Sequence, residues 1–136
     1  MSAIPEEPRQ PPFIFTLDPD AYTSELAQLT TWVNGFLVPV YVTSRIPSSR
    51  SPWCARWWEH PEAIGRLHAL WLAYQAMSNT DSAGITAPHE WHRDHLDPAL
   101  TSLRSPDGPF SGCMTKPHQD THNSPPEVVV LEQAVS

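Results

Sequence analysis

Residues 53–74, with the sequence WCARWWEHPEAIGRLHALWLAY, decide the fold, because they hold four of the six tryptophans of the chain. The triplet His60-Pro61-Glu62 marks a helix start: proline suits the first helical position, and an early glutamate favours the positive end of the helix dipole. Apolar residues then recur at helical spacing as far as Ser78, where we expect the helix to end. A large aromatic side chain hides about 150–250 Å² when buried. This segment is therefore predicted to form the centre of the core.

The segment before it predicts another long helix. Asp18 is suited to cap the first backbone N–H groups, and Pro19 fits the first helical position. Apolar residues follow at steps of three and four up to about Thr43. Pro39 lies inside this stripe and lacks a backbone N–H, so a kink or a break is expected near it. The short apolar patch Phe13-Ile14-Phe15 precedes the helix and is expected to dock on the core.

Two more helices are predicted after the central one. Residues 87–95 follow Thr86, a candidate cap, and contain Trp91 as an apolar anchor. The pair Asp97-Pro98 repeats the cap-and-proline pattern and predicts a short fourth helix. We therefore expect an all-α domain, a small orthogonal bundle of three main helices plus a short fourth.

Length and proline content set the domain organisation. The chain has 136 residues, the size of one ordinary domain, and 16 of them are proline. Helical periodicity is confined to residues 17–118, which predicts a single helical domain over that range. Residues 1–16 are expected to form a proline-rich tail, and residues 119–136 a disordered tail.

The charge distribution restricts the classes of partner. The formal net charge is −7, yet residues 45–116 contain seven basic and seven acidic residues, so the excess of acid lies in the flanks. Acidic flanks repel nucleic acids and membrane surfaces, and a chain with one lysine is poorly suited to bind DNA through many phosphate contacts.

Cysteine content and hydropathy indicate the compartment. Two cysteines are too few for a disulfide scaffold, and neither a signal peptide nor an apolar run of membrane-spanning length is present. We expect a cytoplasmic protein with reduced thiols and no membrane contact.

Three motifs resemble those of a known family. RWWEHPEA at 56–63, WHRDH at 91–95 and DGPF at 107–110, followed by Cys113 and His118, are similar to motifs of an actinobacterial family of unknown function. Members of that family look like passengers of plasmids, phages and integrative elements. The resemblance covers roughly residues 29–118. It implies an accessory protein of a mobile element, and it implies no reaction.

Cysteine and histidine residues offer a candidate zinc site. Zinc takes about four such ligands at about 2.0–2.3 Å. The set predicted here is Cys54, His95, Cys113 and His118, with His60 and His92 as alternative ligands. No pair has the C-x2-C spacing of a strong zinc motif, so buried, unreactive thiols are the competing interpretation.

Two enzymatic interpretations use the same residues. Asp94-His95 followed by Cys113 and His118 superficially resembles the His-Asn-His endonucleases, which would make the chain a metal-dependent hydrolase or nuclease. That site requires a strand before its first histidine, whereas the context here is helical. A cysteine nucleophile, Cys54 or Cys113, would require a histidine base next to it in space. No catalytic residue is assigned.

The densest basic segment offers a candidate binding surface. Arginine and tryptophan are frequent in protein interfaces and also stack on bases. The candidate binding residues are Arg45, Arg50, Arg56, Trp57 and Trp58. The competing interpretation places the arginines in a solvated loop and the tryptophans in the core. We expect a non-enzymatic accessory protein that binds a protein partner, with DNA as a second candidate partner. A role for the acidic flanks in mimicking DNA is a third alternative.

Overall fold

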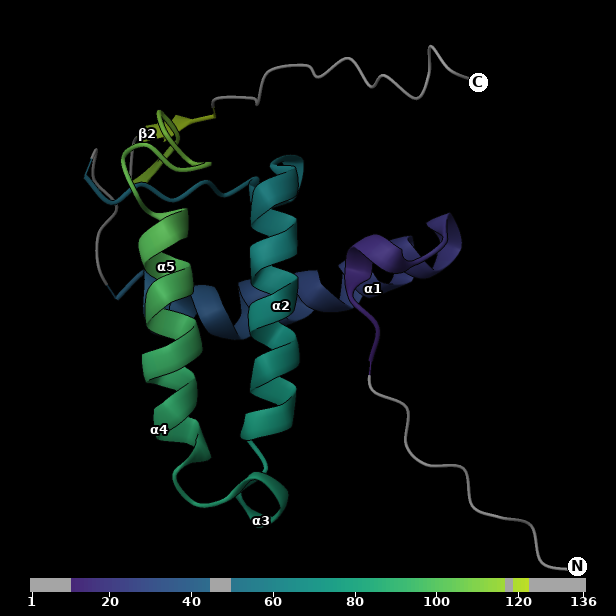
Figure 1. Cartoon of the computed structure of the whole chain (residues 1–136). Helices are drawn as coiled ribbons and strands as arrows, with labels where there is room; N and C mark the ends of the chain where they lie inside the picture. Colours follow the sequence, from purple (N-terminus) through teal and green to yellow (C-terminus); the bar gives the residue numbers. More distant parts are fainter. Residues whose placement is uncertain (1–10, 45–49, 117–118, 123–136) are drawn as a thin grey trace, which may run out of the picture.

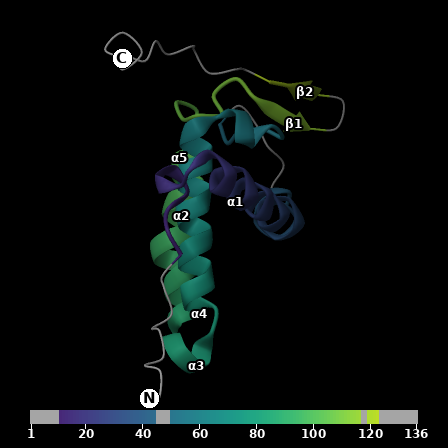
Figure 2. The ribbon, with the colours of Figure 1, turned by 90° about the vertical axis from the view of Figure 1, so that its right-hand side faces the viewer.

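The computed structural model describes residues 11–44, 50–116 and 119–122. Helix α2 and the following run of α4 and α5 lie side by side and antiparallel, and α1 crosses them (Figures 1 and 2). The all-α orthogonal architecture predicted from the sequence is confirmed, and a short β-hairpin is added to it. The elements in chain order are η1 (Ile14–Thr16), α1 (Pro19–Trp32), η2 (Val33–Val42), η3 (Trp57–Glu59), α2 (Pro61–Met77), α3 (Thr80–Ala83), α4 (Ala87–Trp91), η4 (His92–Leu96), α5 (Asp97–Leu103), β1 (Met114–Lys116) and β2 (Gln119–Thr121).

The first long helix begins as predicted and absorbs its proline. The Ala21 backbone N–H donates to Asp18 Oδ1 over 2.9 Å, so Asp18 caps α1. Around Pro39 the helix continues as the π-helical segment η2. In a π-helix each N–H bonds to the carbonyl oxygen five residues earlier, as the Thr43 N–H does to the Val38 carbonyl oxygen at 2.9 Å. A π segment accommodates the missing proline donor without ending the helix.

Helix α2 forms the centre of the core, as its sequence predicts. It starts at Pro61, and its buried residues include Ile64, Leu67 and Leu70. Trp57, just before the helix, is fully buried, and its indole N–H donates to Asn34 Oδ1 at 3.1 Å. The tryptophan-rich segment therefore joins η2 to α2.

The predicted third and fourth helices form one helix. Helix α4, the π-helical η4 and α5 follow one another without a gap. Asp97, predicted to be a cap, has the helical dihedral angles φ −61° and ψ −48°. Pro98 has no backbone N–H, so inside a regular α-helix it would leave one carbonyl oxygen without a donor. The π-helical segment η4 ends just before Pro98 and allows the helix to continue through it. The short separate helix is instead α3, which follows the predicted end of the central helix at Ser78.

The apolar N-terminal patch docks on the core, as predicted, and a buried histidine holds it. Ile14 is fully buried, although the sequence placed it in a tail. Its backbone N–H donates to His68 Nδ1 at 3.3 Å. The other ring nitrogen, Nε2, therefore carries the proton and donates it to Glu25 at 2.7 Å. This neutral histidine links the N-terminal segment, α1 and α2.

The β-hairpin extends past residue 118 into the stretch that was predicted to be a disordered tail. Strand β1 pairs antiparallel with β2, which lies beyond residue 118. Residues 1–10 and 123–136 of the two predicted tails lie outside the described residues. In the described part of the chain, no helix has the length and hydropathy needed to cross a membrane.

Candidate metal centre

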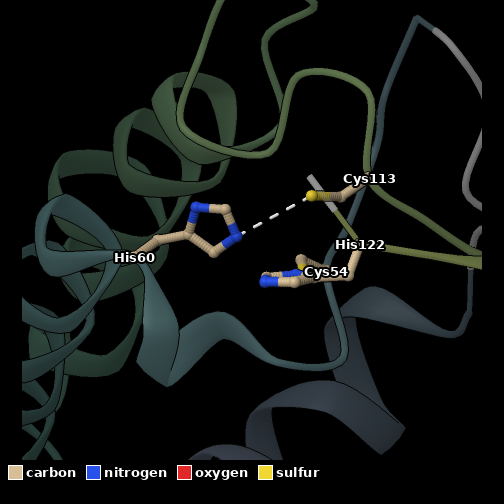
Figure 3. Close-up of side chains that lie close together, drawn as sticks. All are labelled: Cys54, His60, Cys113 and His122. Atoms are coloured by element: carbon tan, nitrogen blue, oxygen red, sulfur yellow. Dashed lines mark hydrogen bonds between the residues drawn. The ribbon is translucent and has the colours of Figure 1, made fainter. Parts of the chain in front are cut away.

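Four metal-ligating side chains converge at the end of the bundle where α2 begins. The ligand atoms of Cys54, His60, Cys113 and His122 all lie within 4.8 Å of one another. Figure 3 shows them meeting from three segments: the stretch before η3, the start of α2, and the base of the hairpin. The two cysteines and His60 are buried, and His122 is partly buried.

Local backbone structure places the first two ligands. The turn η3 reverses the chain between Cys54 and His60, with the His60 N–H donating to the Trp57 carbonyl oxygen at 3.0 Å. His60 occupies the cap position of α2 with extended dihedral angles, and its side chain makes no cap hydrogen bond. Pro61 then fixes the first helical residue. The imidazole of His60 is therefore directed to Cys113.

The hairpin places the other two ligands. Gly112 has a φ of 81°, a left-handed conformation that glycine adopts without strain, and it turns the chain just before Cys113. The strands pair in the register Met114 with Thr121. Continued by one residue, this register sets Cys113 opposite His122. Two ligands separated by eight residues are thus brought together across the open end of the hairpin.

The distances suit one tetrahedral ion. Zinc–sulfur and zinc–nitrogen bonds of about 2.3 and 2.0 Å place neighbouring ligand atoms about 3.5 Å apart. Cys54 Sγ lies 3.1 Å from His122 Nδ1, and Cys113 Sγ lies 3.7 Å from His60 Nε2. The widest separation is 4.8 Å, so closing on an ion needs movements of at most about 1 Å. Two sulfur and two nitrogen donors form a set that zinc commonly takes.

Burial sets the protonation of two of these ligands. Burial raises the pKa of the Cys54 thiol to about 12; the Arg56 backbone hydrogen bond opposes this, and nearby Cys113 adds to it. Burial, followed by the neighbouring His122, lowers the pKa of His60. A neutral imidazole is the form that binds metal. A thiol has to lose its proton to bind a metal, so zinc would displace the proton of Cys54 on binding.

Glu59 lies behind one of the histidines. Its Oε2 atom is 3.8 Å from His122 Nε2, and that nitrogen is buried without a hydrogen-bond partner among the described residues. Histidines that bind metal through one nitrogen usually donate the other N–H to a carboxylate or a carbonyl oxygen. With His122 binding through Nδ1, Glu59 is in position to be this outer partner. The orphaned nitrogen therefore fits a metal centre.

Comparison with known proteins places the chain in a family. A family model of a domain of unknown function (DUF4913) matches residues 26–131. The chain belongs to this family. The matched range includes all four candidate metal ligands and the whole hairpin. No curated protein and no solved structure matches the chain.

The sequence prediction identified part of the four-residue cluster of this chain. Cys54 and Cys113 belong to it, as does His60, which was predicted only as an alternative ligand. His95 does not belong to it, because it lies exposed on η4. His92 is engaged elsewhere, with Nε2 2.8 Å from the Tyr41 hydroxyl. His118 lies outside the described residues.

His122 was missed. It lies in a stretch that was predicted to be a disordered tail, and only the pairing of β1 with β2 brings it to Cys113. Residues 114–121 contain no Asn-Gly or Asp-Gly pair that would have signalled a hairpin turn.

The predicted binding residues have different environments. Trp57 is fully buried and offers no surface to a partner in this structure, whereas Trp58 is 42 % exposed. Arg50 lines a pocket beside α5 together with Arg104, and Arg56 lies 3.9 Å from Glu59 in an exposed pair. Arg45 lies outside the described residues.

A Glu59→Gln substitution is expected to weaken zinc binding by about 10–100-fold, the usual effect of losing an outer partner of a metal-bound histidine. The measurement is competition with a chromogenic zinc chelator. Glu62→Gln is the matched control, because Glu62 also pairs with an arginine, Arg66, at 2.9 Å and lies in the first turn of α2, three residues after Glu59. Equal affinities of the two variants would contradict the role assigned to Glu59.

Proposed function

We propose that the chain is a non-enzymatic accessory domain in which one zinc ion, bound by Cys54, His60, Cys113 and His122, fastens the hairpin to the helical body. The observation that carries this proposal is the four-residue cluster itself. Structural zinc sites are closed, with four protein ligands from Cys and His, whereas catalytic sites keep one position for water or substrate.

The scarcity of contacts between the hairpin strands and the helices supports a structural role. Among the described elements, β1 and β2 contact chiefly each other and make little contact with any helix. A two-stranded hairpin is marginally stable in water by itself. A metal bound between its base and the start of α2 would supply the missing attachment.

The hydrolase or nuclease alternative has less support. It requires Asp94 and His95 to act with Cys113, but both residues are exposed on η4. Asp94 pairs with Arg93 at 2.8 Å, and within the described residues neither joins the group of ligands around Cys113.

The accessory role requires a partner, and we propose a protein. Trp58 is a large aromatic side chain that is 42 % exposed, two residues before His60. Exposed tryptophan is a frequent anchor in protein interfaces. DNA as a second partner and an origin on a mobile element stay predictions, drawn from the basic segment and from the resemblance.

Zinc analysis of the purified chain tests the proposal. The protein is reconstituted with zinc, desalted and analysed by mass spectrometry for metal content. We expect one zinc ion per chain in the wild type and in His95→Ala, but well below one in His122→Ala. His95→Ala is the matched control because the sequence alone predicted it as the ligand. Substoichiometric zinc in the wild type, or retention by His122→Ala with loss by His95→Ala, would overturn the proposal.

A further inference from the structure

Four aromatic side chains form a closed ring at the other end of α2. Phe36 contacts Tyr41 and Tyr74 at ring-centroid distances of 5.8 and 5.2 Å. Trp91 completes the ring with contacts of 6.0 Å to Tyr41 and 5.1 Å to Tyr74. Three of the four contacts have interplanar angles between 60° and 77°. The side chains therefore stand as walls and do not form a single stack.

These walls line a pocket of about 280 Å³. Small-molecule pockets usually have about 300–1,000 Å³, so this one admits only a small group. Its other lining residues come from the end of α2 and from α4 and its continuation; they are Met77, Ser78, Pro88 and His92. No acidic, lysine or arginine side chain lines it.

The hydrogen bonds of His92 determine how the Tyr41 hydroxyl is oriented. His92 Nδ1 lies 2.7 Å from the Pro88 carbonyl oxygen, which can only accept, so this nitrogen carries the proton. In the neutral imidazole, His92 Nε2 then accepts from the Tyr41 hydroxyl at 2.8 Å. Burial, with the neighbouring Tyr74, raises the pKa of Tyr41, so the hydroxyl keeps its proton. The oxygen lone pairs of Tyr41 stay available at the pocket wall.

Three electrostatic features of the pocket favour a cation, whereas Pro88 lies at the start of α4, the positive end of its dipole. The faces of aromatic rings carry partial negative charge. The Tyr41 oxygen is an acceptor, and Met77 and Ser78 stand at the C-terminal end of α2, the negative end of its dipole. Because no carboxylate lines the pocket, the cation that suits it is weakly hydrated and partly apolar.

We propose that the ring of Phe36, Tyr41, Tyr74 and Trp91 binds a methylated ammonium group. Such groups are recognised by cation–π contacts in aromatic cages. The group can be carried by a free small molecule of the choline type or by a methylated lysine side chain. This site is independent of the zinc proposal, since α2 has 17 residues and its two ends are therefore about 25 Å apart.

Calorimetric titration of the full chain tests the site with two probes of the same shape. Choline carries a trimethylammonium group, and 3,3-dimethyl-1-butanol carries a neutral tert-butyl group in its place. We expect choline to bind about tenfold more tightly than the alcohol, the size of effect expected for desolvated cation–π contacts. A peptide with trimethyllysine and its unmethylated form are titrated in parallel. Tighter binding of the methylated peptide than of choline would assign the group to a modified protein, and the reverse order to a small molecule.

Variants separate this site from the rest of the molecule. Phe36→Leu and Tyr74→Leu are each expected to weaken choline binding at least about fivefold, whereas Phe15→Leu, on an exposed ring outside the pocket, leaves it unchanged. Circular dichroism establishes whether each variant is folded. One folded ring variant, Phe36→Leu or Tyr74→Leu, is enough for the test. Binding in the zinc-free His122→Ala variant should equal that of the wild type. Equal affinity for choline and for the neutral alcohol would overturn the proposal. The absence of any binding, of choline at 50 mM and of the methylated peptide at 1 mM, would also overturn it, since these concentrations correspond to about the weak end of such contacts.

Discussion

The double variant Cys54→Ser, Cys113→Ser is expected to bind no zinc and to lose the protection of its hairpin amides, while α2 keeps its own. The hairpin has two short strands that contact chiefly each other among the described elements, so the metal would provide most of what fixes it. Zinc binding in small zinc domains is worth about 10–16 kcal/mol, which far exceeds the stability of an isolated hairpin. Loss of two of the four ligands should therefore release it.

Hydrogen exchange followed by mass spectrometry measures this effect. Peptides from residues 111–122 are expected to exchange about a hundredfold faster or more in the double variant than in the zinc-loaded wild type. Peptides from residues 61–77 should change little. Treating the wild type with a chelator should reproduce the variant, which controls for the packing of the two buried side chains. Unchanged protection of residues 111–122 after zinc removal would show that the hairpin does not depend on the metal.

A Trp57→Ala substitution is expected to lower the free energy of unfolding by about 3–5 kcal/mol, because it empties the volume of a fully buried indole. The change also removes the hydrogen bond from the indole N–H to Asn34. Domains of this size are stabilised by about 5–15 kcal/mol in total, so the variant should be near its folding limit.

Trp58→Ala provides the matched control in the adjacent position. Trp58 is 42 % exposed and contacts Trp57 edge-on at 5.9 Å, so its removal should cost no more than about 1 kcal/mol. Urea unfolding measures the free energy of unfolding of both variants. All samples contain excess zinc, so that the metal contributes equally to each measurement. Similar losses for the two variants would contradict the assignment of Trp57 to the core and Trp58 to the surface.

The helices could be predicted because their signals are local. Asp18 with Pro19 and His60 with Pro61 each place a cap position before a proline, and both mark observed helix starts. The same pattern at Asp97-Pro98 was misleading, because the preceding π-helical turn allows a helix to continue through it. A cap-and-proline pair thus identifies a start only when nothing upstream can continue the helix.

The candidate metal centre could be predicted only in part, because its ligands are joined by non-local structure. Cys54 and Cys113 were identified by residue type, and His60 by its closeness to Cys54. His95 was predicted as a ligand, but it lies exposed on η4 and is not part of the cluster. His122 depends on the register of a hairpin whose own sequence gives no turn signal, and no local pattern could supply that information.

On the ribosome, the centre can be completed only after His122 has left the exit tunnel, because the ligands occur as an early pair and a late pair. Cys54 and His60 emerge first and are followed by more than fifty residues of helix and turn before Cys113 appears. Helices form within microseconds, far faster than translation adds residues. The nascent helical body would therefore hold two of the four donors in place until the hairpin arrives, and metal capture would have to wait for the hairpin.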